Sequence, residues 1–191
     1  MNHPEKSHIA TTLKLRSGKS LLIREAHPDD SEEIIDYVNQ VGGETDFLTF
    51  AGGEFTKTVE EERNILQSYL DIENQVYLVA VVDDKIIGLL NLMAKQKPRL
   101  RHVGEMGVSV IKEFWGQGIG EQLIASLIKW AEENPIIKKI NLLVVEHNHR
   151  AIALYKRIGF QVEGRFKKDF YIDEKYYDGI IMGLWLGAEE N

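Results

Sequence analysis

A short run of closely spaced glycines, Gly116-Gln117-Gly118-Ile119-Gly120, constrains the fold of this chain more than any other stretch. The apolar run before it, residues 106–111, predicts a buried strand, and the pattern after it predicts an amphipathic helix. The apolar positions of that helix are Ile119, Leu123, Ile124, Leu127, Ile128 and Ala131. A strand, a glycine turn and a helix present free backbone N–H groups at a helix N-terminus, a natural seat for a phosphate group. A tight connection that uses glycine only for packing is the competing interpretation.

Two familiar phosphate-binding motifs do not fit this turn. No Lys followed by Ser or Thr comes after Gly120, so the stretch is not a P-loop. The longer Gly-x-Gly-x-x-Gly spacing of dinucleotide-binding folds is absent too, as is an acidic residue at the distance that ribose binding needs. A nucleotide-binding module is therefore the weakest functional hypothesis.

Composition and charge narrow the class of protein. The 191 residues are 43% hydrophobic, so we expect a single domain over 1–191 with its core at about 20–187. The formal net charge of −7 argues against a nucleic-acid partner. The absence of cysteine excludes disulfides and cysteine nucleophiles. The first twenty residues lack a signal-peptide pattern and no stretch approaches 18 apolar residues, so we expect a cytoplasmic protein without a membrane partner.

Hydrophobic periodicity predicts the element order β-α-α-β-β-β-α-β-α-β-β, after a loose polar lead-in at residues 1–19. The predicted strands are 20–25, 76–82, 86–94, 102–111, 139–146, 160–172 and 176–186. The first helix opens at His27-Pro28-Asp29-Asp30 and ends at Gly42-Gly43, and the second is capped by Thr58 with Glu61. The third follows the glycine turn and closes near Asn134, and the fourth runs from a cap at Asn148 to Gly159. This order predicts an α/β fold, a mixed sheet with helices on both faces.

Three pieces of the chain resemble the GNAT superfamily of acyl-CoA-dependent N-acetyltransferases over about residues 21–186. They are the glycine turn, the run Val145-Glu146-His147-Asn148 with Ala151-Ile152-Ala153-Leu154-Tyr155 and Ile158-Gly159-Phe160, and the closing strand Tyr176-Tyr177-Asp178-Gly179-Ile180-Ile181-Met182. The C-terminal third is similar to the branch with ribosomal-protein N-terminal and amino-acid or polyamine acetyltransferases. The resemblance implies a mostly antiparallel central sheet. One position departs from the family: Trp115 stands where Arg or Gln is usual, and we expect it to pack beneath the turn.

The resemblance implies acetyl-CoA as co-substrate and assigns residues to it. Its pyrophosphate would meet the backbone amides of the turn, and its pantetheine arm would pair with the preceding strand like an extra strand. Gly107 would mark a bulge in that strand, which frees the amide of Val108 to stabilise the oxyanion, although a glycine that only relieves packing is the competing interpretation. Asn148 would cap its helix and also bind the pantetheine region. The expected cofactor-binding residues are Val108, Ser109, Val110, Gly116, Gln117, Gly118, Ile119, Gly120, Glu121, Asn148, Ala151 and Tyr155.

Two residues are candidates for the proton transfers. Glu105 is a lone carboxylate in an otherwise apolar strand and could take the proton of an alkylammonium, directly or through water, although a solvated carboxylate on an exposed strand face is the competing interpretation. Tyr155 could protonate the departing thiolate, although its position on an apolar helix stripe also suits a core tyrosine. No histidine has metal-ligand spacing, and we expect no metal.

The sequence thus predicts an N-acetyltransferase that moves acetyl from acetyl-CoA to a primary amine of a small molecule, of amino-acid or polyamine type, in a ternary complex. A protein or peptide N-terminal acetyltransferase is the alternative enzyme, and a non-catalytic acyl-CoA-binding regulator is the alternative of another class. Residues 42–56 and the final hairpin would select the acceptor. Glu44, Asp46 and Glu54 could recognise a cationic amine, although a solvated loop is the competing interpretation. The resemblance also suggests a homodimer through the C-terminal strands.

Overall fold

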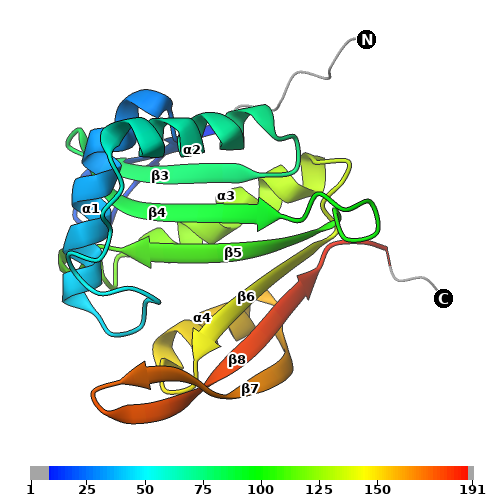
Figure 1. Ribbon diagram of the computed structural model, residues 1–191. Coiled ribbons are helices and arrows are strands. Elements are labelled where there is room, and N and C mark those ends of the chain that lie inside the picture. Colours follow the sequence, from blue (N-terminus) through cyan, green and yellow to red (C-terminus); the bar gives the residue numbers. More distant parts are fainter. Residues whose placement is uncertain (1–8, 189–191) are drawn as a thin grey trace.

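A mixed eight-stranded sheet organises the chain, in the order β1-β2-β3-β4-β5-β6-β8-β7 (Figure 1). The computed structural model describes residues 9–188. The strands are β1 (Ala10–Lys14), β2 (Ser20–Glu25), β3 (Val76–Val82), β4 (Lys85–Ala94), β5 (Val103–Val110), β6 (Lys139–Val145), β7 (Gln161–Ile172) and β8 (Lys175–Trp185). The helices are α1 (Ser31–Glu44), α2 (Val59–Asp71), α3 (Ile119–Glu133) and α4 (His149–Ile158), with short 3-10 turns η1 (Pro28–Asp30) and η2 (Lys112–Phe114). The helices α1 and α2 cover one face and α3 and α4 the other, which confirms the predicted α/β class and the mostly antiparallel sheet (Figure 1).

The strand β1 corrects the predicted element order. Residues 1–19 were expected to be a polar lead-in, but β1 pairs antiparallel with β2 from Ala10 opposite Arg24 to Lys14 opposite Ser20. Only Thr11 and Leu13 of β1 are partly buried, since it is an edge strand with one neighbour. Such short polar edges resist aggregation and carry little hydrophobic signal, which is why periodicity missed it. The observed order begins β-β, and residues 1–8 lie outside the described part of the chain.

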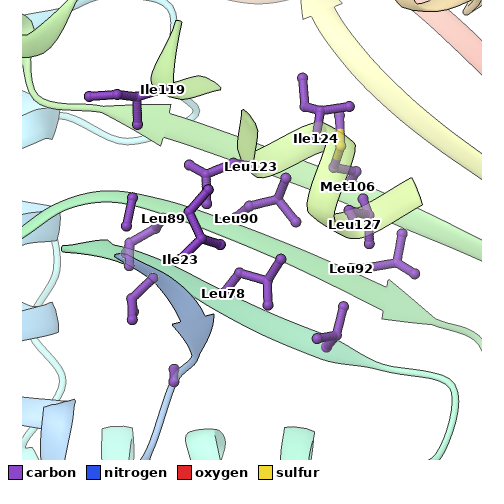
Figure 2. Close-up of a cluster of buried hydrophobic side chains, with 14 of the residues drawn as sticks. Ile23, Leu78, Leu89, Leu90, Leu92, Met106, Ile119, Leu123, Ile124 and Leu127 are labelled. Carbon is purple, nitrogen blue, oxygen red and sulfur yellow. The ribbon is translucent and has the colours of Figure 1, made fainter. Parts of the chain in front are cut away.

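Part of the core lies between α3 and the strands it crosses (Figure 2), and α1 and α2 add further buried side chains. Leu123 and Leu127 of α3 are fully buried, as are Leu90 and Leu92 of β4. A Cβ at Gly88 would lie 3.2 Å from a methyl carbon of Leu123, so the glycine lets α3 approach β4 closely. This packing fixes the position of the α3 N-terminus relative to the sheet, and the site depends on that position.

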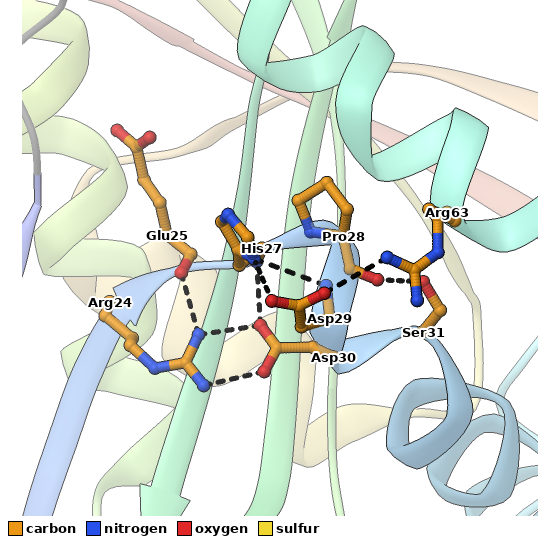
Figure 3. A network of polar contacts seen from close by, with 8 residues as sticks. All are labelled: Arg24, Glu25, His27, Pro28, Asp29, Asp30, Ser31 and Arg63. Atoms are coloured by element: carbon orange, nitrogen blue, oxygen red, sulfur yellow. Dashed lines mark hydrogen bonds and ion pairs between the residues drawn. The ribbon is translucent and has the colours of Figure 1, made fainter.

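The entry to α1 is held by a polar network (Figure 3). Arg24 donates two hydrogen bonds to the carboxylate of Asp30, at 2.7 and 2.8 Å, and this ion pair lowers the pKa of Asp30 against the opposing effect of its burial. The backbone N–H of His27 donates to the same carboxylate, and Arg63 of α2 donates to Asp29. The predicted start at His27 is therefore a 3-10 turn that leads into α1.

The end of α1 differs from the prediction, and the difference matters for the site. Gly42 and Gly43 were expected to end the helix, but α1 continues to Glu44. A Cβ at Gly42 would come within 2.9 Å of the backbone of Ala51, so glycine is needed there for the loop after α1 to lie against the helix. Asn39 fixes the same loop by donating to the carbonyl of Phe55 and accepting from the N–H of Gly53. The loop at residues 45–58 is thereby held over the sheet.

Strands β5 and β6 pair only over a short stretch. Their parallel pairing runs from Val103 to Glu105, and Figure 1 shows the two strands diverging beyond it. The register of β5 with β4 is regular from Gly104 to Val110, so the bulge expected at Gly107 is absent. A Cβ at Gly107 would meet Asn91 Oδ1 at 2.9 Å, and this close approach accounts for the glycine. The fork between β5 and β6 opens the sheet without a bulge.

Candidate active site

One cavity of about 1240 Å³ runs through the fork between β5 and β6 to the glycine turn. Every site residue predicted from the sequence lines it: Glu105, Val108, Ser109, Val110, Gly116, Gln117, Gly118, Ile119, Gly120, Glu121, Asn148, Ala151 and Tyr155. The fold brings these residues together from β5, the turn, α3 and α4. Their individual roles stay predictions.

The glycine turn has the geometry of an anion site. Gly116 and Gly118 have φ angles of 82° and 84°, which residues with a Cβ rarely adopt. Gly118 is the N-cap of α3 and provides no capping side chain. The helical ladder begins with Gln122 N–H donating to the carbonyl of Gly118 at 3.0 Å, so the amides just before Gln122 stay available to a ligand. The positive end of the α3 dipole adds to the attraction for phosphate.

The side chain of Trp115 contacts two groups at this turn. Its indole N–H donates to the carbonyl of Val110 at 2.7 Å, which ties the turn to the end of β5. The guanidinium carbon of Arg150 lies 5.6 Å from the centre of the Trp115 ring, and Arg150 lines the cavity. The side chain of Trp115 is 37% exposed, so it does not pack beneath the turn as expected.

Sequence reasoning missed the cations at the turn. Arg150 comes from the first turn of α4, and Arg157, farther along α4, pairs with Glu121 of α3 at 2.9 Å. Both line the cavity. The signal was present in the sequence as basic residues on a helix capped by Asn148, but nothing in the sequence placed α4 beside the N-terminus of α3.

The strand β5 offers an open backbone edge to the cavity. Beyond Glu105 it has no pairing with β6, while its other edge stays paired with β4 as far as Val110. An extended arm could therefore pair there as an added strand, as the resemblance implies. The Ser109 hydroxyl is 3.0 Å from the hydroxyl of Tyr37 in α1, so its side chain is already engaged. Ile111 N–H donates to the carbonyl of Ile87, and the alternation of this pairing turns the backbone of Ser109 toward β4 and the N–H groups of Val108 and Val110 toward the open edge.

The helix α4 places Asn148 and Tyr155. Asn148 Oδ1 accepts a hydrogen bond from the N–H of Ala151 at 3.2 Å, which confirms the predicted cap. Tyr155 is buried, with its ring centre 5.8 Å from that of Phe160. Burial raises the pKa of Tyr155 to about 12, so the phenol stays protonated at physiological pH.

Charged side chains of β7 and β8 hold the turn that leads into α4. Asp178 of β8 accepts hydrogen bonds from Lys167, the N–H of Lys168, and Arg165, and these partners hold its pKa far below the usual range for aspartate. The carboxylate of Glu146 accepts from the N–H of Asp178 at 3.0 Å. The turn before α4 is thus anchored to β7 and β8.

Glu105 lies on β5 at the fork with β6. It is an exposed position of β5 that lines the cavity, and its carboxylate has no ion pair or hydrogen bond within residues 9–188. Across the fork, Asn141 of β6 lies opposite Glu105. The Oδ1 atom of Asn141 is buried without a hydrogen-bond partner, as is Gln117 Oε1 in the turn.

The loop at residues 45–58 forms another wall of the cavity. Phe47, Leu48, Phe50 and Phe55 line the cavity together with Glu54. The ring of Phe47 is 5.3 Å from that of His147, which is 4.3 Å from Tyr177. Of the other two acidic candidates, Glu44 accepts from the N–H of Lys112 at 2.6 Å and Asp46 does not line the cavity.

Within residues 9–188 no cluster of His, Cys, Asp and Glu side chains is suited to hold a metal ion. In the same range, none of the helices has the length and apolar character needed to cross a membrane.

Comparison with known proteins decides the family. A profile described as the acetyltransferase (GNAT) family matches residues 45–160. The chain belongs to this family. GNAT enzymes take the acetyl group from acetyl-CoA, so acetyl-CoA is the co-substrate and the chain is an acyl-CoA-dependent N-acetyltransferase, as predicted.

Similar proteins support this assignment over different lengths. The L-amino acid N-acetyltransferase AaaT of Escherichia coli is 31% identical over 105 residues, which are 55% of this chain and 65% of that protein. The spermidine N(1)-acetyltransferase of Escherichia coli is 22% identical over 88% of each chain. The crystal structure of a GNAT-family acetyltransferase from Streptococcus pneumoniae is 36% identical, covers 87% of this chain and 99% of its own, and has a TM-score of 0.85.

Proposed function

We propose that this GNAT enzyme acetylates the primary amine of a small molecule of amino-acid or polyamine type by direct transfer in a ternary complex. The observation that supports it is one continuous cavity that joins the free amides of the α3 N-terminus to Glu105 and Tyr155. The similarity to an amino-acid and to a spermidine acetyltransferase agrees with this acceptor class.

The donor half of the cavity suits acetyl-CoA, which supplies an activated acetyl thioester. The amides of Gly118 to Glu121 and the guanidinium of Arg150 would hold its phosphates, since both carry positive charge at the turn. The open edge of β5 at Val108, Ser109 and Val110 would pair with the pantetheine arm. The amide of Val108 would donate to the acyl oxygen as negative charge develops there.

The acceptor half suits an amine. An alkylammonium with a pKa of about 10 is charged at neutral pH and must lose a proton before it can attack. The unpaired carboxylate of Glu105 would take this proton, directly or through water. The aromatic and aliphatic side chains of the loop at residues 45–58 would contact the carbon chain of the acceptor.

The buried phenol of Tyr155 would act on the leaving group. Full proton transfer from a phenol with a pKa of about 12 to a thiolate whose conjugate acid has a pKa of about 8.5 is uphill by roughly 5 kcal/mol. We therefore expect Tyr155 to donate a hydrogen bond to the sulfur while the carbon–sulfur bond breaks. This interaction strengthens as charge develops, so it would raise kcat.

The first experiment is a titration calorimetry measurement with acetyl-CoA, followed by a thiol-release assay over spermidine, L-amino acids and short peptides with free N-termini. We expect micromolar binding and release with a small amine. Release only with peptides would favour the N-terminal acetyltransferase, because the apolar loop would then accept a peptide side chain. Binding without release on any amine would favour the regulator, and failure to bind acetyl-CoA would refute the proposal.

A further inference from the structure

We infer that Asn141 is a second binding group for the acceptor amine, beside Glu105 at the fork of β5 and β6. The inference rests on the proposed function, since it concerns the amine side of the same cavity. Asn141 was not among the site residues predicted from the sequence, because 35 residues and a whole helix lie between it and Glu105.

The register of the sheet places the two side chains next to each other. Met93, Glu105, Asn141 and Gly183 lie opposite one another across β4, β5, β6 and β8. Directly opposed residues on neighbouring strands project to the same face of a sheet. Glu105 and Asn141 also form the last pair before the strands diverge, and both line the cavity.

The buried oxygen of Asn141 needs a donor. Its Oδ1 atom is buried and has no hydrogen-bond partner within the described residues 9–188. A buried polar atom left unpaired costs free energy comparable to a lost hydrogen bond, so such atoms in native proteins call for an explanation. Its neighbours on this face supply no donor: Gly183 has no side chain, and the Lys139 ammonium is paired with Glu163 at 2.6 Å.

An amine satisfies both groups at once. An alkylammonium has three N–H donors, of which one can go to the Glu105 carboxylate and one to Asn141 Oδ1, once the Asn141 amide, which lines the cavity, turns this oxygen toward the bound amine. When Glu105 takes a proton, the N–H bond to that proton breaks, an O–H bond forms and the nitrogen keeps the electron pair. Asn141 does not titrate, so it continues to accept an N–H from the neutral amine and orients its lone pair. Asn141 is thus a positioning residue for the nucleophile, and Glu105 alone changes protonation.

The test compares Asn141→Leu with a matched control. Leucine has a similar volume but no acceptor oxygen, so we expect the KM of the amine to rise roughly tenfold. The KM of acetyl-CoA and the pH at half-maximal rate should not change. Lys139→Met is the control, because Lys139 lies two residues away on the same strand and does not line the cavity. It should leave the amine KM unchanged.

A second variant and a binding measurement make every outcome decisive. Asn141→Asp keeps the side-chain shape and adds a negative charge, so it should tighten the Kd of butylamine, a bare primary amine, for the protein loaded with CoA. If wild type acetylates amines but neither variant changes the amine KM or Kd, the inference is wrong and the proposed function stands. If wild type acetylates no amine, butylamine binding that weakens in Asn141→Leu still supports the inference. Equal or absent butylamine binding would refute it.

Discussion

Replacement of Arg150 by glutamine should weaken the use of acetyl-CoA but not of S-acetyl-pantetheine, a donor that lacks the phosphates. Arg150 is an exposed residue whose guanidinium is 5.6 Å from the ring centre of Trp115. Glutamine keeps a polar side chain and removes the charge. The variant therefore separates binding of the phosphates from the chemistry of the thioester.

Typical interaction energies set the expected change in the KM of acetyl-CoA. A hydrogen bond to a charged group contributes about 1.5–3 kcal/mol, and exposure of Arg150 to solvent reduces this by screening. About 1.4 kcal/mol corresponds to a tenfold change, so we expect the KM of acetyl-CoA to rise roughly tenfold. The contact with the Trp115 ring contributes about 0.5–1 kcal/mol at an exposed site. Trp115→Leu should therefore raise the same KM about threefold and should have little further effect once Arg150 is replaced.

The assay is steady-state thiol release at varied concentrations of each donor and a saturating concentration of one amine. It is run at low and at high salt. The Arg150→Gln effect should shrink at high salt, since screening already weakens the interaction in wild type. An equal loss with acetyl-CoA and S-acetyl-pantetheine would refute a phosphate contact and point to a structural role for Arg150. Unchanged KM values for both donors would refute any role of Arg150 in donor binding.

Other consequences can be measured in the same preparations. Tyr155→Phe should lower kcat by at least tenfold and leave the Kd of acetyl-CoA unchanged, because the hydroxyl acts only on the leaving group; an unchanged kcat would contradict this. Between pH 10 and 12 the unfolded state loses the Tyr155 proton while the folded state keeps it, so stability present below pH 10 falls by up to about 2.7 kcal/mol. In urea unfolding, the stability of Tyr155→Phe should fall by about 2.7 kcal/mol less than that of wild type over this pH range. Tyr171→Phe, which replaces a 63% exposed residue, should lose as much stability as wild type. Gly42→Ala should destabilise the protein by about 1–3 kcal/mol and raise the amine KM, since its Cβ would lie 2.9 Å from the loop backbone. Gly43→Ala, whose Cβ has 4.0 Å of space, should not destabilise it, and a larger loss there would refute the packing argument. If the exposed apolar side chains of β7 and β8 form the expected homodimer, Phe166→Glu should give a monomer in light scattering.

Much of the fold could be predicted because it depends on local pattern. The periodicity of α3, the caps at Thr58 and Asn148, and the left-handed Gly159 are each set by a few consecutive residues. The errors have equally specific causes. The strand β1 is a polar edge without a hydrophobic stripe, and Gly42 serves a close approach to a loop that only the folded chain brings near.

The glycine turn could also be predicted from the sequence, because the turn and the helix it opens are continuous in the chain. Its cations could not, since Arg150 and Arg157 reach the turn only when α4 packs beside α3. The pKa of Tyr155 is a further case, because burial sets it and the residue type alone suggests a stronger acid.

The sequence by itself determined the order of most elements, the glycine turn and the family, because each follows from residue type and spacing along the chain. The tertiary structure decided where β5 and β6 part, and so placed Glu105 beside Asn141. Strand register is a property of pairing between distant segments, and a shift of one residue would turn these side chains to opposite faces of the sheet. This part of the cavity, which we propose binds the acceptor, therefore exists only in the folded protein.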